Sequence, residues 1–376
     1  MPHLDSSFDT LFRCNMGVTA GERIIVFTDT IRDDESPSER DRDRRTSLLQ
    51  VARECADFAS ARYGSTAFIT FPATSASGAE PPTPLWESVF GHRIVGELSA
   101  DGVLEKLLAK KGSPWDLEHA RSMVGRYRGD VAQVVIALSN NSTSHTSFRK
   151  LACHGGSRFA SLPHFDPEMF LTSMRADPVA LRRRTAEVAR VLNGGVEIEV
   201  TTPLGTSLVM DMRGRRAEGD DGDLTSPGSF GNLPAGEVYL APVEGSAEGT
   251  MVITHAPTRE LLSPLILTVR GGEVVEIDGD DPYRQVLEAK FAESRLNRNI
   301  AELGIGTNDR ASRADNVLEA EKILGTVHVA LGDNSGFGGR VTTPFHEDYV
   351  LFRPTLTVIR GDGGRVPLLV DGNLLP

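Results

Sequence analysis

The hydrophobic pattern of this chain changes near residue 190, and that change constrains the fold more than any other feature. Before it, runs of consecutive apolar residues such as RIIVFTDT at 23–30 alternate with stretches of helical periodicity. Such runs are typical of strands buried on both faces, and strands alternating with helices predict a parallel sheet. After it, short alternating strands are joined by glycine-rich turns, a pattern typical of antiparallel sheets.

The two patterns predict two domains, because 376 residues are too many for one ordinary core. We expect residues 1–190 to form a Rossmann-like α/β domain and residues 191–376 to form a β-rich α+β domain. In the second domain, glycines at 271–272 and 361–364 predict hairpin turns. The stretch at 282–295 predicts its one internal helix.

The charge, the apolar runs and the cysteine content of the chain indicate which classes of partner to expect. The chain has 52 acidic and 40 basic residues, and an acidic surface repels phosphate backbones, so we expect no nucleic acid partner. No apolar run reaches the roughly 18 residues of a membrane span, and the first residues lack the pattern of a signal peptide. Three widely spaced cysteines are typical of reduced proteins. We therefore expect a cytoplasmic protein with a small-molecule or peptide substrate and no membrane partner.

A polar loop follows the third predicted strand, at 139–147. Ligands of open α/β sheets bind at the carboxyl ends of strands, so Ser142, His145, Thr146 and Arg149 could contact a substrate. Helix capping explains the same residues, and we favour it. No GxGxxG opens a helix and no GxxxxGK[ST] is present, so no nucleotide cofactor is expected.

The strongest local signal for chemistry is the segment His346–Asp348. On an extended strand, residues i and i+2 project from the same face, so His346 and Asp348 can converge on a cation. The preceding segment 333–344 is rich in glycine, which allows backbone to approach a site closely.

Three further residues join this pair. His328 lies on a predicted buried strand, where its larger apolar neighbours face one way and the histidine faces the other. A core histidine is the alternative. Glu237 and Glu302 adjoin glycines in apolar segments, and buried carboxylates are almost always paired or metal-bound. Two histidines and three carboxylates suit zinc, cobalt, manganese or iron. The predicted metal ligands are Glu237, Glu302, His328, His346 and Asp348.

Several segments resemble the aminopeptidase T family of dinuclear metallo-aminopeptidases: GNLPAGEVYLAPVEGSAEGTMVI, ELGIGTN, EAEKILGTVHVALGDNSGFGG and PFHEDYVLF. The resemblance implies two divalent metal ions per chain at the five predicted ligands, a carboxylate bridge such as Glu237, and a homodimer. A related branch comprises mononuclear iron dioxygenases that open dihydroxypyridine rings. In the aminopeptidase branch a tyrosine follows the HxALG histidine by seven residues, where this chain has Ser335.

The favoured function is a metal-dependent aminopeptidase that hydrolyses the N-terminal amide of a peptide or a small amide. Two zinc, cobalt or manganese ions would polarise water and the scissile carbonyl. Glu302 would support turnover by holding an ion, and Glu321 is the candidate general base. An exposed helix glutamate paired with Lys322 is the competing interpretation of Glu321.

Two alternatives stay open. In a mononuclear Fe(II) dioxygenase of the 2,5-dihydroxypyridine type, His328, His346 and Asp348 would form the ligand triad, which leaves Glu237 and Glu302 without a role. A catalytically inactive binding protein would have no reason to keep all five ligand types.

Overall fold

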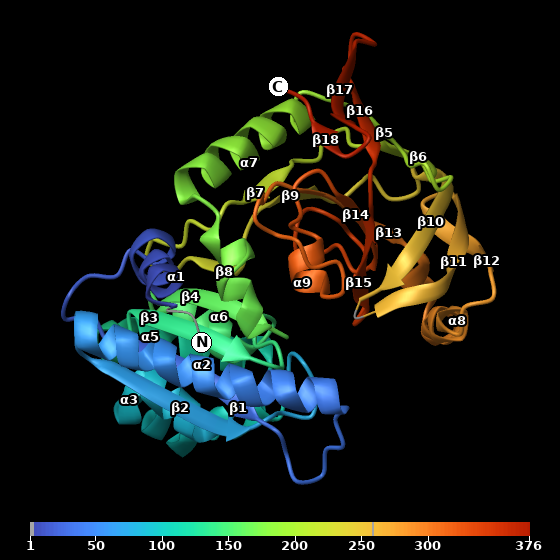
Figure 1. The fold of residues 1–376 in the computed structure, drawn as a ribbon. Helices are drawn as coiled ribbons and strands as arrows, with labels where there is room; N and C mark the ends of the chain where they lie inside the picture. The colour runs from blue at the N-terminus through green and yellow to red at the C-terminus, as the bar shows by residue number, and fades with distance from the viewer. Residues whose placement is uncertain (1–3, 258) are drawn as a thin grey trace. The chain divides into compact units, whose positions relative to one another are not determined.

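The structure of the protein is a computed structural model that describes residues 4–257 and 259–376. The chain forms two compact units (Figure 1). The first comprises the chain up to Arg175 together with Gly222–Pro234, and the second comprises Ala176–Asp221 together with Ala235–Pro376. The division into domains at 1–190 and 191–376 stays a prediction.

The first unit is built on one five-stranded sheet, in the order β2-β1-β3-β4-β8. Its strands are β1 (Ile24–Thr30), β2 (Thr66–Pro72), β3 (Val134–Ser139), β4 (Arg158–Pro163) and β8 (Phe230–Asn232). Every neighbouring pair is parallel, so the predicted parallel sheet is confirmed. The sequence did not indicate β8, because a three-residue strand with a central glycine carries no hydrophobic pattern. The finer Rossmann-like assignment stays a prediction.

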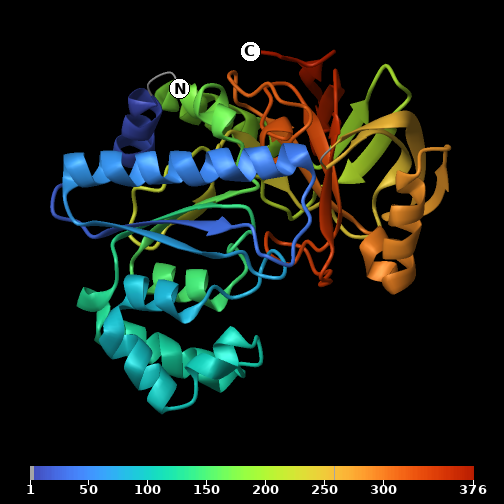
Figure 2. The same ribbon diagram turned by 60° about the horizontal axis from the view of Figure 1, so that its bottom comes forward.

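Helices cover both faces of this sheet (Figure 2). They are α1 (Asp5–Asp9), α2 (Glu39–Tyr63), α3 (Thr83–Ala100), α4 (Leu104–Leu108), α5 (Pro114–Arg126) and α6 (Ser147–His154). The long α2 lies on one face, while α3, α5 and α6 share a core with Phe27, Val135 and Phe159 on the other. Ser38 caps α2 by accepting a hydrogen bond from the Asp41 N–H, so the preceding charge run leads into a helix.

The polar loop after β3 caps the helix α6, the interpretation that we favour from the sequence. Thr146 Oγ1 accepts a hydrogen bond from the Arg149 N–H at 3.1 Å, and the Arg149 Nε donates to the Ser144 carbonyl at 2.7 Å. Ser142 Oγ donates to Ser144 Oγ at 3.0 Å. These bonds account for the local pattern at Ser142, Thr146 and Arg149 without a ligand.

The second unit contains two antiparallel sheets. The larger has the order β12-β11-β10-β6-β5-β16-β17-β18 and the smaller β15-β14-β13-β9-β7. The larger consists of β5 (Glu197–Thr201), β6 (Ser207–Asp211), β10 (Glu248–Ala256), β11 (Arg259–Arg270), β12 (Glu273–Asp278), β16 (Thr355–Ile359), β17 (Arg365–Val370) and β18 (Asn373–Leu374). The smaller consists of β7 (Glu218–Asp220), β9 (Glu237–Leu240), β13 (Ile300–Gly306), β14 (Val327–Gly332) and β15 (His346–Leu351).

The hairpins that the glycines predict are confirmed. Gly271 and Gly272, with φ of 57° and 76°, join β11 to β12, and β16 pairs with β17. The predicted helix is α8 (Tyr283–Glu293), and the unit also contains α7 (Pro178–Leu192) and the short α9 (Val317–Ala320). The chain therefore has a mixed α/β fold with several sheets.

The described residues also contain short π-helical and 3₁₀-helical segments. They are η1 (Thr10–Asn15), η2 (Arg128–Asp130), η3 (Pro167–Phe170), η4 (Ser173–Arg175) and η5 (Arg295–Arg298). Among the described residues, none of the helices has the length and apolarity to cross a membrane.

Alternation along the smaller sheet decides where a site can lie. Val238, Leu303, Ile305, Val327 and Val329 belong to one buried apolar core that includes residues of the larger sheet. Since successive strand residues point to opposite faces, the residues between them point away from this core. That opposite face carries the candidate site.

Candidate metal centre

The smaller sheet assembles the site by register. Neighbouring residues across its strands alternate between charged or aromatic side chains and very small ones. The pairs that define this face are Glu237 with Gly306, Tyr239 with Gly304, Gly304 with His328, Glu302 with Ala330, Ala330 with Asp348, and Gly332 with His346. Small residues on the middle strands therefore leave room for the long side chains beside them.

Gly304 forms the floor under His328. A Cβ atom at position 304 would lie 2.0 Å from two ring atoms of His328, closer than atoms can approach. The imidazole therefore lies directly over the glycine backbone. Its Nε2 is 3.3 Å from Glu302 Oε1 and 3.5 Å from Glu237 Oε2.

The first ligand group consists of Glu302, His346 and Asp348, whose ligand atoms all lie within 4.8 Å of one another. His346 Nε2 is 3.5 Å from Glu302 Oε2 and 3.7 Å from Asp348 Oδ1. The other ring nitrogen, Nδ1, lies 2.8 Å from the Asp333 carbonyl. A carbonyl oxygen only accepts, so Nδ1 carries a proton and Nε2 is the nitrogen that would bind an ion once its own proton is lost, the arrangement usual for a metal-binding histidine.

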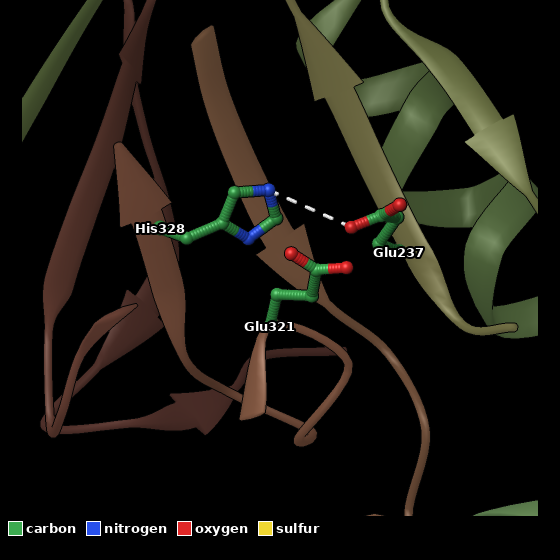
Figure 3. A group of neighbouring side chains, drawn as sticks. All are labelled: Glu237, Glu321 and His328. Carbon is green, nitrogen blue, oxygen red and sulfur yellow. Dashed lines mark ion pairs between the residues drawn. The ribbon is translucent and has the colours of Figure 1, made fainter. Parts of the chain in front are cut away.

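The second group consists of Glu237, Glu321 and His328, which converge from β9, the end of α9 and β14 (Figure 3). The His328 side chain is 1% exposed. Among the described residues, its Nδ1 has no hydrogen-bond partner. A buried polar atom without a partner costs free energy, so an ion or water is expected to satisfy it.

A buried ammonium also lies in this second group. Lys322 Nζ is 2.5 Å from Glu237 Oε1 and 2.7 Å from Glu321 Oε1, and its side chain is 1% exposed. The expected pairing of Glu321 with Lys322 is therefore present. The expectation that Glu321 is exposed is wrong, because its side chain is only 13% exposed, held inward by the buried lysine.

The electrostatic field of the site favours cations. Burial lowers the pKa of His346, but Asp348 and Glu302 more than offset this and raise it to about 10. Burial likewise opposes protonation of His328, yet Glu302, Glu237 and Asp348 raise its pKa to about 9. Burial raises the pKa of Glu321 to about 8, against the lowering effect of Lys322. A divalent ion would replace the protons that these carboxylates attract.

The donor set fits a transition metal. Imidazole nitrogens and carboxylate oxygens suit zinc, manganese and non-haem iron. The structure brings together all five predicted ligands and Glu321, in two adjoining groups. It places Glu302 with His346 and Asp348, whereas the dioxygenase triad expected from the sequence left Glu302 without a role.

Two aromatic residues near the site were not anticipated. Tyr239 lies two residues after Glu237 on the same strand face, a signal that the alternation rule could have found. Phe337 comes from the glycine-rich segment before His346, and its ring is 6.0 Å from the His346 ring. Loop geometry cannot be read from sequence, so this contact was not predictable.

Comparison with known proteins identifies the family. A family model described as NicX, 2,5-dihydroxypyridine 5,6-dioxygenase, matches residues 121–374, more than half of the chain. The chain belongs to the NicX family. The matched range contains every residue of the two ligand groups. A search of curated proteins finds no match.

Two solved structures share the fold. The 2,5-dihydroxypyridine dioxygenase from Pseudomonas putida is 16% identical, with a TM-score of 0.68, over 99% of this chain and 96% of that one. AmpT from Thermus thermophilus is 15% identical, with a TM-score of 0.61, over 99% of each chain. At such identities the likeness concerns the fold alone. Membership of the NicX family supports an enzyme and favours the dioxygenase alternative over the aminopeptidase.

Proposed function

We propose that this protein is a mononuclear Fe(II)-dependent dioxygenase that opens the ring of 2,5-dihydroxypyridine or a closely related hydroxylated ring. The observation that carries the proposal is the NicX match, which spans the whole candidate centre. In the reaction for which the family is named, both atoms of O₂ enter the product as the bond between ring carbons 5 and 6 breaks. Oxygen is thus the only oxidant required.

The position of Lys322 is evidence that the centre holds one ion and not two. Its ammonium already pairs with Glu237 and Glu321, the carboxylates that a second ion would need. A divalent ion about 4 Å from this ammonium would meet a repulsion on the order of 8 kcal/mol at an effective dielectric constant of about 20. The ion pairs of Glu302 and Asp348 are instead with histidines, which lose their protons when an ion binds. The ion is therefore proposed at Glu302, His346 and Asp348, with His328 adjoining.

Each residue of the centre has a defined task in this proposal. His346 presents Nε2 because the Asp333 carbonyl holds its other nitrogen protonated. The carboxylates of Glu302 and Asp348 supply the charge that retains the cation. Bound iron would supply the redox chemistry with O₂ that no side chain of this set provides.

The position that distinguishes the aminopeptidase branch is also consistent with this assignment. Where that branch has a tyrosine, Ser335 donates from its backbone N–H and its hydroxyl to the Asp333 carboxylate, each at 3.1 Å. The site therefore has no phenol from this position.

The second candidate is the aminopeptidase. Its support is the fold shared with AmpT and the second ligand group, which offers three donors to another ion. The homodimer implied by the resemblance is part of this proposal for either activity.

Paired activity assays test the proposal. Protein loaded anaerobically with Fe(II) should consume O₂ in step with the loss of 2,5-dihydroxypyridine absorbance. Protein loaded with zinc, cobalt or manganese should not hydrolyse amino-acid anilides. His346→Ala should abolish O₂ uptake. Anilide hydrolysis by the wild type, without O₂ uptake on any hydroxylated pyridine, would establish the aminopeptidase instead.

A further inference from the structure

The segment between β14 and β15 is an internally bonded loop. Asn334 is fully buried, its N–H donates to the Val341 carbonyl at 3.1 Å, and its Oδ1 accepts from the Val341 N–H at 2.8 Å. A Cβ atom at Gly339 would lie 1.9 Å from the Asn334 side chain, so a larger residue could not take its place. The loop therefore has a defined conformation.

A carboxylate from another segment fastens this loop. Glu244 Oε1 accepts hydrogen bonds from the Arg340 N–H at 2.7 Å and from Asn334 Nδ2 at 3.1 Å. Arg215 pairs with Glu244 and donates to the Gly338 carbonyl. Glu244 and Arg215 thus hold the Gly338 carbonyl of the GFGG turn and the residues Asn334 and Arg340 on either side of the turn.

That residue is Phe337, whose ring lies beside the ligand group. Its centroid is 5.7 Å from the Tyr239 ring at 87° and 6.0 Å from the His346 ring at 88°. Both geometries are the edge-to-face arrangement that aromatic pairs favour. Phe337 and Tyr239 are both only partly buried, so neither residue is enclosed in the core.

We propose that Phe337 packs against the ring of the substrate and thereby selects planar aromatic substrates. The proposal rests on the proposed function and adds to it a specificity-determining residue. A ring bound beside Glu302, His346 and Asp348 would have the Phe337 ring as a neighbour, because that ring lies 6.0 Å from the His346 ring. A flat aromatic ring gains the stacking or edge contact, whereas an acyclic amide does not.

The test compares Phe337→Leu with wild-type protein, both loaded with Fe(II). Leucine keeps an apolar side chain but removes the ring. Phe352→Leu is the matched control, because Phe352 is a partly buried aromatic that contacts His255 instead. The measurements are iron per chain, the Kd of 2,5-dihydroxypyridine by anaerobic calorimetry, and KM and kcat for O₂-dependent ring opening.

We expect Phe337→Leu to keep its iron while Kd and KM rise about threefold to tenfold, the worth of one aromatic pair. Phe337→Tyr, which keeps an aromatic ring, should have the wild-type Kd and KM. Phe352→Leu should also have the wild-type values. Unchanged Kd and KM in Phe337→Leu would overturn the inference, as would a loss of iron, which would show that the ring only positions His346. A wild-type protein that neither binds nor opens the ring would overturn the proposed function itself, a result visible before any variant is compared.

Discussion

Several side chains of the site have room because the residues beside them are small. His328 reaches the centre of the site because position 304 has no side chain. Ala330 on β14 lies between Glu302 on β13 and Asp348 on β15. Lys322 is buried because two carboxylates receive its ammonium. The small residues thus matter to the site as much as the charged ones.

The variant Gly304→Ala tests whether the His328 ring needs the space that a glycine leaves at position 304. The new methyl group would overlap the His328 ring, so the imidazole must turn away from Glu302. Metal affinity should fall about 10–100-fold, as it does when residues that orient ligands are lost. Gly96→Ala, in α3, is the control, because nothing lies within 4 Å of a Cβ there. A metal titration checks the prediction, and equal affinity in both variants would contradict it.

Metal uptake should release protons. The pKa of His346 is raised to about 10 and that of His328 to about 9, so both are protonated at pH 7.5 in the metal-free protein. A ligand nitrogen must be neutral, so binding should release at least one proton per ion. Calorimetry in two buffers of different ionisation enthalpy measures this number. A heat of binding independent of the buffer would show that the histidines were already neutral.

Among the secondary-structure elements, the strand β13 carries both the core and the site. Leu303 and Ile305 face the apolar core, while Glu302 and Gly304 face the ligand groups. Successive residues of a strand point to opposite faces of its sheet. This rule predicts the direction of His328 on β14, and it applies equally to β13. A shift of β13 by one residue would exchange the two faces.

Leu303→Ala should therefore destabilise the fold without touching a ligand. Leu303 is 1% exposed, and truncating a buried leucine costs about 2–5 kcal/mol. Val275→Ala, at a position that is 48% exposed, should cost less than about 0.5 kcal/mol. Denaturant unfolding of the metal-free proteins measures both. Equal midpoints for the two variants would mean that β13 is not part of the core.

For the whole molecule, the sequence predicted the parallel sheet, the antiparallel second half and its hairpins. These follow from the period of the apolar residues, which is a local property. The short β8 and the position of Phe337 were beyond reach, because both depend on contacts between distant segments. The charged residues of the centre could be found as buried carboxylates and histidines. The division into two groups and the buried state of Lys322 required the register between strands.

The metal-free protein should lose stability as the pH rises. The folded-state pKa of His346 and of His328 lies above its usual value of 6.5. The stability each adds is complete below about pH 6.5 and is lost toward pH 9–10. Asp348, whose pKa is lowered to about 2 despite burial, contributes above about pH 4. Unfolding midpoints from pH 6 to 10 should therefore fall, with a smaller slope in His346→Gln. Equal slopes would contradict these shifts.

The number of ions per chain distinguishes a mononuclear centre from a dinuclear one. Purified protein is saturated with Fe(II) without oxygen, freed of excess metal and assayed for metal per chain, beside Glu302→Gln and Glu237→Gln. We expect one ion in the wild type, one in Glu237→Gln, and weakened or lost binding in Glu302→Gln, because of these two glutamates only Glu302 belongs to the group proposed to hold the ion. Two ions in the wild type, with one lost in Glu237→Gln, would show that Lys322 does not exclude a second cation and would contradict the mononuclear centre.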